Sequence, residues 1–120
     1  MKKLFFGLIL LVPFLVSAQQ VARSLTASNG QLVGFYEFKP ADYNNNPSAT
    51  FPLIIFLHGI GERGDGLGGL VNMVGVGIPG YINRGATMNF NGQSFLVLSP
   101  QLHFNYGSWQ NFYIDEMLNY

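Results

Sequence analysis

The segment FPLIIFLHGIGERGDG, residues 51–66, decides the fold, because an apolar run changes here into a glycine-rich, charged loop. Leu53 to Leu57 form a short, continuous apolar run rich in β-branched and aromatic side chains, which predicts a strand buried on both faces. His58-Gly59 ends that strand. In an α/β sheet, ligands bind in the crevice beyond the carboxyl ends of the strands, so we expect the chemistry from His58 onward.

The composition excludes several classes of function. The chain has 120 residues, of which 48% are hydrophobic and 10% charged, with no cysteine and no formal net charge. There is no basic run of the kind that nucleic-acid binding needs. A chain without cysteine has neither disulfides nor thiolate ligands, and two widely separated histidines do not form a zinc pattern. We therefore expect no nucleic acid, no metal and no cofactor.

The first 18 residues have the pattern of a secretory signal peptide. Lys2 and Lys3 precede an apolar run over residues 4–16, and small residues lead to an expected cleavage after Ala18. The run is shorter than the roughly 20 residues of a membrane-spanning helix, although an uncleaved anchor is the alternative. We expect a secreted or periplasmic protein with no membrane attachment after cleavage, whose residues 19–120 form part of one domain.

Strand and turn signals lie before the organising segment. Residues 23–26 are expected to begin an edge strand, and residues 31–39 are rich in strand formers. Between them, Ser28-Asn29-Gly30 predicts a hairpin turn, because Asn and Gly tolerate positive φ. Residues 40–52 contain prolines and a triple Asn without apolar periodicity, which indicates an exposed loop.

Helical turns and a second apolar strand follow the segment. Residues 67–74 predict a short helix, and residues 78–83 a second one with Gly85 as its C-cap. Residues 95–98 predict a buried strand parallel to the first, reached by a right-handed crossover, and from Trp109 the pattern is helical again. The predicted class is α/β, with an N-terminal hairpin, parallel strands and a sheet that is unfinished in this chain.

The spacing of the glycines matches a dinucleotide-binding motif only superficially. Residues 59–64 read G-x-G-x-x-G directly after a strand. That motif opens a helix and is followed, about 20 residues later, by an acidic residue at a strand end. More glycines follow here, and Arg84 stands at that distance. Because the helix and the acidic residue are both missing, the sequence argues against a nicotinamide cofactor.

The His-Gly pair indicates a different chemistry, which is half of an oxyanion hole. Backbone N–H groups that point at the negative oxygen of a tetrahedral intermediate contribute about 3 to 4 kcal/mol each. Gly59 allows a sharp turn, so the amide of Ile60 is the expected donor and that of Gly61 a nearby alternative.

The motifs LIIFLHGIGERGDG, GIPGYI and FLVLSPQ, followed by Trp109, resemble the α/β-hydrolase superfamily. More narrowly, they are similar to secreted bacterial phospholipase/carboxylesterase-like and feruloyl-esterase-like serine hydrolases, over about residues 31–120. The resemblance implies the N-terminal portion of an α/β-hydrolase sheet, with Ile60 as oxyanion donor. It also implies a set of residues that shape the loop, His58, Gly59, Glu62 and Arg63, and two near the cleft, Gln101 and Trp109. The alternatives are a solvated charge pair at Glu62 and Arg63, and core packing of Trp109.

The nucleophile of that family is missing from this chain. It belongs in G-x-S-x-G, with the acid and the histidine later in the sequence. Ser94 has a glycine two residues before it but a leucine two after, and Ser28 has a glycine two after it but a threonine two before. His58 and His103 precede the place of the nucleophile, so structural roles are expected for them. We expect nucleophile, acid and base beyond Tyr120, and a chain that is inactive alone.

Three functions are compatible with these observations. The first is the N-terminal part of an exported serine hydrolase that acts on small-molecule or polysaccharide-linked carboxylic esters. The second is a non-catalytic secreted module that binds carbohydrate or protein, because the nucleophile is missing. The third is a peptidase similar to prolyl oligopeptidases.

Overall fold

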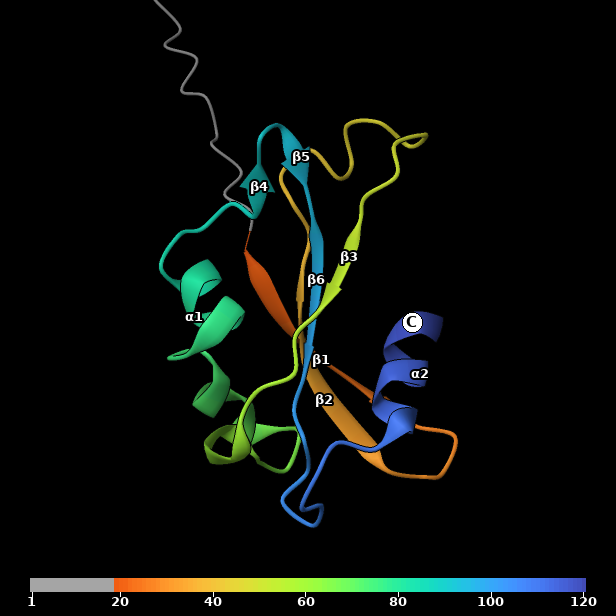
Figure 1. The fold of residues 1–120 in the computed structure, drawn as a ribbon. Coiled ribbons are helices and arrows are strands. Elements are labelled where there is room, and N and C mark those ends of the chain that lie inside the picture. Colours follow the sequence, from red (N-terminus) through yellow and green to blue (C-terminus); the bar gives the residue numbers. More distant parts are fainter. Residues whose placement is uncertain (1–18) are drawn as a thin grey trace, which may run out of the picture.

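A four-stranded mixed sheet forms the centre of the structure, which is a computed structural model that describes residues 19–120 (Figure 1). The strand order is β1-β2-β6-β3. The strands are β1 (Gln20–Thr26), β2 (Leu32–Phe38), β6 (Leu96–Pro100) and β3 (Leu53–Ile55). The predicted signal peptide and its cleavage site lie outside the described residues.

The N-terminal hairpin is confirmed. Strands β1 and β2 pair antiparallel, with Ser24 opposite Gly34. The turn between them has Gly30 at a φ of 83°, the positive value that the sequence predicted at this position. β1 begins at Gln20, a few residues earlier than predicted.

The parallel pairing and the crossover are also confirmed. β3 and β6 are parallel, with Ile54 opposite Val97. The described residues also form two 3-10 helices and two α-helices, which are η1 (Ile60–Glu62), η2 (Gly68–Met73), α1 (Gly77–Asn83) and α2 (Asn111–Asn119). Figure 1 shows α1 and α2 on opposite sides of the sheet, which is the arrangement of an α/β fold.

The glycine-rich segment between β3 and β6 forms helices close to the predicted places. The predicted helix over residues 67–74 is a 3-10 helix, because Gly68 and Gly69 disfavour a longer α-helix. Leu70 and Met73, three residues apart on one face of it, are buried, and Val74 directly after it is half-buried. The helix predicted over residues 78–83 is α1.

The prediction of β3 as a strand buried on both faces is wrong. β3 has three residues and lies at the edge of the described sheet. Leu53 and Leu57 are each 39% exposed. An apolar run indicates that side chains avoid water, but the lateral order of strands is decided by long-range pairing. Within residues 19–120, β2 and β6 occupy the middle.

A small hairpin was not predicted. β4 (Asn89–Phe90) and β5 (Gln93–Ser94) pair antiparallel at the end of the sheet where β6 begins (Figure 1). Asn91 and Gly92 between them both have positive φ, 51° and 84°. Asn-Gly is the strongest short hairpin signal in a sequence, so this element could have been predicted.

The core has two parts, because alternate residues of a strand face opposite sides of the sheet. The part on the α2 side includes Phe35, Leu98, Tyr113 and Met117. The part on the α1 side comprises Phe38, Ile82, Met88 and Val97. Within residues 19–120, no helix has the length and apolarity that crossing a bilayer requires.

Candidate functional site

The site is built on the turn that follows β3. The 3-10 helix η1 begins at Ile60, with Gly59 before it in an extended conformation. The first N–H groups of a 3-10 helix have no partner inside the helix, so the amides of Ile60 and Gly61 are not consumed by it. Ile60 is 70% exposed. The turn therefore presents two adjacent amides at the carboxyl end of β3.

His58 anchors the start of this turn. Its ring is buried, and its Nε2 accepts a hydrogen bond of 2.9 Å from the backbone N–H of Leu102. Its Nδ1 lies 2.5 Å from the carbonyl oxygen of Gly59 and therefore carries the proton. Burial lowers the pKa of His58, against weaker raising effects of the Gly59 carbonyl and of Glu62. His58 is thus a neutral anchor with both ring nitrogens engaged.

Trp109 packs against the same histidine. Its indole Nε1–H donates to the carbonyl oxygen of His58 at 3.1 Å. The two rings meet edge to face at 4.9 Å, and the indole makes a similar contact with Tyr113 at 5.2 Å. Trp109 is half-buried, so it packs on the core and leaves part of its surface at this end of the sheet.

Gln101, which was expected near the cleft, lies buried beneath the loop. The residue is 1% exposed. Its Oε1 accepts from the N–H of Gly66 at 3.0 Å, and its Nε2 donates to the carbonyls of Glu62 at 2.8 Å and Gly69 at 2.7 Å. The sequence could not show these partners, which lie more than 30 residues away along the chain.

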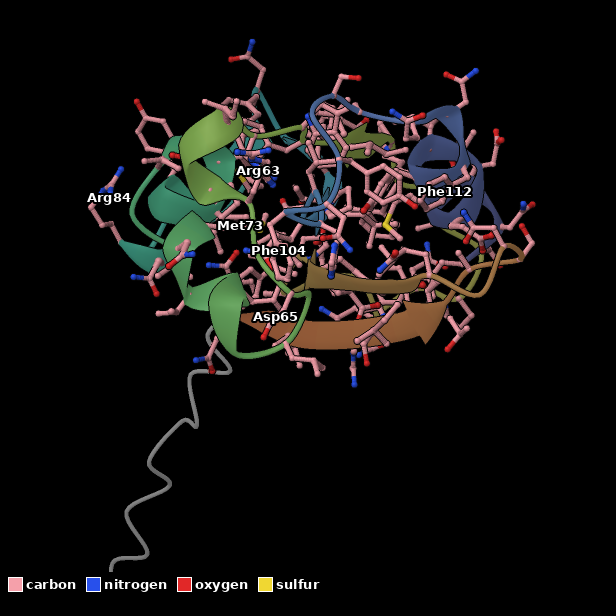
Figure 2. All side chains as sticks on the ribbon, turned by 90° about the horizontal axis from the view of Figure 1, so that it is seen from below. Arg63, Asp65, Met73, Arg84, Phe104 and Phe112 are labelled. Carbon is pink, nitrogen blue, oxygen red and sulfur yellow. The ribbon has the colours of Figure 1, made fainter. Side chains whose placement is uncertain are left out.

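Glu62 and Arg63 both engage the turn and its neighbours. Figure 2 looks onto this end of the molecule from below and shows Arg63 there. The Arg63 guanidinium donates from Nη1 to the carbonyl of Tyr106 at 3.0 Å and from Nε to that of Ile60 at 3.2 Å. A carboxylate oxygen of Glu62 lies 3.9 Å from Nδ1 of His58. Arg63 therefore joins η1 to the segment that follows β6.

Asp65 is a loop residue that the sequence analysis missed. Its Oδ1 accepts hydrogen bonds from the N–H groups of Gly69 and Leu67, both at 2.9 Å. These bonds lower the pKa of its carboxyl, with the bond from Gly69 as the larger cause. An Asp whose side chain accepts from the N–H two residues on forms an Asx turn, and an Asp between glycines is a turn signal that could have identified it.

Two of the cavities lie beside β3, and a smaller one touches the loop at Gly66 and Leu67. One of about 520 Å³ is mainly apolar and is lined by Ile54, Ile78, Tyr81, Ala86, Thr87, Met88, Asn89 and Phe90. Another of about 420 Å³ is lined by residues that include Leu53, Leu98 and Met117. Both flank β3. Neither is lined by the His58–Gly66 segment.

The described part of the chain holds no group of three side chains that could bind a metal ion. Nor does it assemble a nucleophile with a base. Ser94, which matches the first glycine of the elbow pattern, is buried and donates to Asp42 at 3.1 Å. It lies in β5, at the opposite end of the sheet from η1 (Figure 1). The described residues therefore offer backbone N–H groups at the η1 turn, without a nucleophile and base beside them.

Comparisons with known proteins agree with the partial fold. No protein-family model matches the sequence, and no curated protein matches it. A solved structure described as a thermostable esterase is similar, with a TM-score of 0.50 and 28% identity over 81% of this chain. The chain spans 24% of the length of that esterase. The described residues therefore form part of an α/β fold of the hydrolase type.

Proposed function

We propose that this chain supplies the oxyanion side of an exported serine hydrolase that acts on carboxylic esters, either small molecules or esters linked to polysaccharides. The observation that carries the proposal is the η1 turn, which presents the Ile60 and Gly61 amides at the carboxyl end of β3. The similarity to an esterase of which this chain covers 24% supports it. Nucleophile, acid and base are proposed to lie in polypeptide beyond Tyr120.

The mechanism assigns one role to these residues. A downstream serine, deprotonated by a histidine, attacks the ester carbonyl, and the carbonyl oxygen becomes negative. The Ile60 N–H, with Gly61 beside it, donates to that oxygen. Collapse of the intermediate expels the alcohol, and water then releases the acid from the acyl-enzyme. His58 takes no proton in this scheme, because both of its nitrogens are already bonded.

The test uses the intact polypeptide, expressed from the coding sequence continued past Tyr120. We expect an apolar strand followed by G-x-S-x-G, labelling of its serine by a fluorophosphonate probe, and hydrolysis of p-nitrophenyl esters. A genuine stop codon at this point would favour the secreted binding module instead. Cleavage of peptides in preference to esters would favour the peptidase.

Ile60 offers a sharp variant and a matched control. Ile60→Pro removes the N–H together with the isoleucine side chain, and proline is tolerated at the first position of a helix after an extended residue such as Gly59. We expect kcat to fall about 10² to 10³-fold with little change in KM. Ile60→Ala keeps the amide and should retain kcat. Equal kcat values in the two variants would contradict the assignment of Ile60.

A further inference from the structure

We infer that Gln101 is the positioning residue of the oxyanion turn, because its buried amide holds the backbone that presents the Ile60 and Gly61 N–H groups. The inference rests on the proposed function, since it gives Gln101 a role in the reaction assigned to that turn. Gln101 itself does not touch substrate.

The side-chain amide of Gln101 is fully used. Its oxygen accepts from the N–H of Gly66, and its two N–H groups donate to the carbonyls of Glu62 and Gly69. These three bonds, of 2.7 to 3.0 Å, span the whole loop from η1 to the start of η2. A buried amide that loses one of these partners leaves a polar group unpaired, so the loop conformation and the amide orientation specify each other.

The contact to Glu62 acts directly on the turn. Glu62 is the last residue of η1, so the Gln101 amide holds one end of the turn. His58 holds the other end through the N–H of Leu102. The two anchor points, residues 101 and 102, are consecutive and directly follow β6. Both ends of the turn are therefore hydrogen-bonded to two adjacent residues, Gln101 and Leu102, directly after β6.

The packing around this amide leaves little room for adjustment. A Cβ added to Gly64 would lie 2.4 Å from Oε1 of Gln101. The backbone of Gly64 is itself bonded to the segment after β6, with its N–H on the carbonyl of Leu102 at 3.1 Å and its carbonyl accepting from Phe104 at 3.0 Å. A change in the Gln101 side chain is consequently transmitted to the turn.

The test compares Gln101→Glu and Gln101→Met with a control, Gln110→Glu, in the intact hydrolase. Glu places an oxygen against the carbonyls of Glu62 and Gly69, whereas Met removes all three bonds and adds no charge. Gln110 is exposed, and its amide contacts only Ser108 nearby. We expect kcat to fall up to about 10²-fold in both Gln101 variants with KM nearly unchanged, because small displacements of catalytic groups have effects of that size.

Hydrogen exchange of residues 59–66 provides a readout that is independent of catalysis. It should be accelerated roughly tenfold or more in the Gln101 variants and unchanged in the control. Folded Gln101 variants that keep kcat, or that raise only KM, would overturn the inference. So would failure of both variants to fold, because the role would then be general stability. Absence of esterase activity in the wild type would instead refute the proposed function, while the exchange data would still show whether Gln101 holds the turn.

Discussion

His58 is hydrogen-bonded at both ring nitrogens, and these bonds determine how the stability of the turn depends on pH. Nε2 of His58 can accept the Leu102 N–H only while the ring is neutral. Protonation would place an N–H against an N–H in a buried position. The fold therefore favours the neutral ring, in agreement with the lowered pKa that burial produces.

This contact predicts a pH dependence of stability. The pKa of folded His58 lies below its ordinary value of 6.5. Between the folded pKa and the ordinary value, the unfolded chain binds a proton at His58 that the folded chain does not. The contribution of neutral His58 to the free energy of unfolding is therefore complete when the pH is above the ordinary pKa, and it is lost as the pH falls toward the folded pKa.

His58→Gln is the matched variant, because its Oε1 can accept from Leu102 and does not titrate. We expect the free energy of unfolding of the wild type, relative to the variant, to decrease from about pH 8 to about pH 5. Chemical denaturation at several pH values measures it, and groups elsewhere cancel in the difference. A difference that is constant with pH would show that burial does not hold His58 neutral.

At the scale of elements, the loop after η1 is pressed against β2. A Cβ added to Gly34 of β2 would lie 1.8 Å from the carbonyl oxygen of Gly66. Gly66 itself has a φ of 75°, which glycine adopts without strain. In addition, the N–H of Gln101 donates to the carbonyl of Gly34 at 2.8 Å. The middle of the sheet and the loop thus meet backbone to backbone.

We expect Gly34→Ala to destabilise the protein by about 3 kcal/mol, at the upper end of the range for overpacking, because backbone rather than a flexible side chain must move. Gly68→Ala is the control, since a Cβ there meets nothing within 4 Å. Urea titration of both variants measures the effect. Similar stabilities would mean that β2 and the loop separate easily, and the site would then be less rigid than its contacts indicate.

At the scale of the whole molecule, β3 is an unpaired edge. Among the described residues, no strand pairs with the outer edge of β3. Two cavities are lined in part by residues of this strand. The strand carries no charged residue or proline of the kind that protects edges from association. The other edge, β1, contains Arg23.

Residues 19–120 expressed alone are therefore expected to self-associate through β3. Leu53→Lys should reduce this association, because a lysine on an edge strand opposes pairing with another chain. Val21→Lys, on the exposed opposite edge, adds the same charge and should have a smaller effect. Light scattering after size-exclusion chromatography distinguishes them. A stable monomer with the wild-type sequence would favour the binding module over the hydrolase.

The sequence by itself determined the local elements of this protein and the place where its chemistry is sought. Ser28-Asn29-Gly30 predicted the hairpin, two short apolar runs predicted the parallel pair, and His58-Gly59 predicted the turn that follows β3. These features depend on φ preferences and on side-chain periodicity, which act between near neighbours. The role of Ile60 and Gly61 as oxyanion donors stays a prediction.

Only the tertiary structure decided which strands lie in the middle and which side chains hold the turn. β3 was expected in the interior and lies at the edge. Gln101 was expected near a cleft and is buried under the loop. Both outcomes depend on contacts between segments far apart in the chain, where hydrogen-bond partners and burial are fixed by the packing of whole elements and leave no local pattern in the sequence.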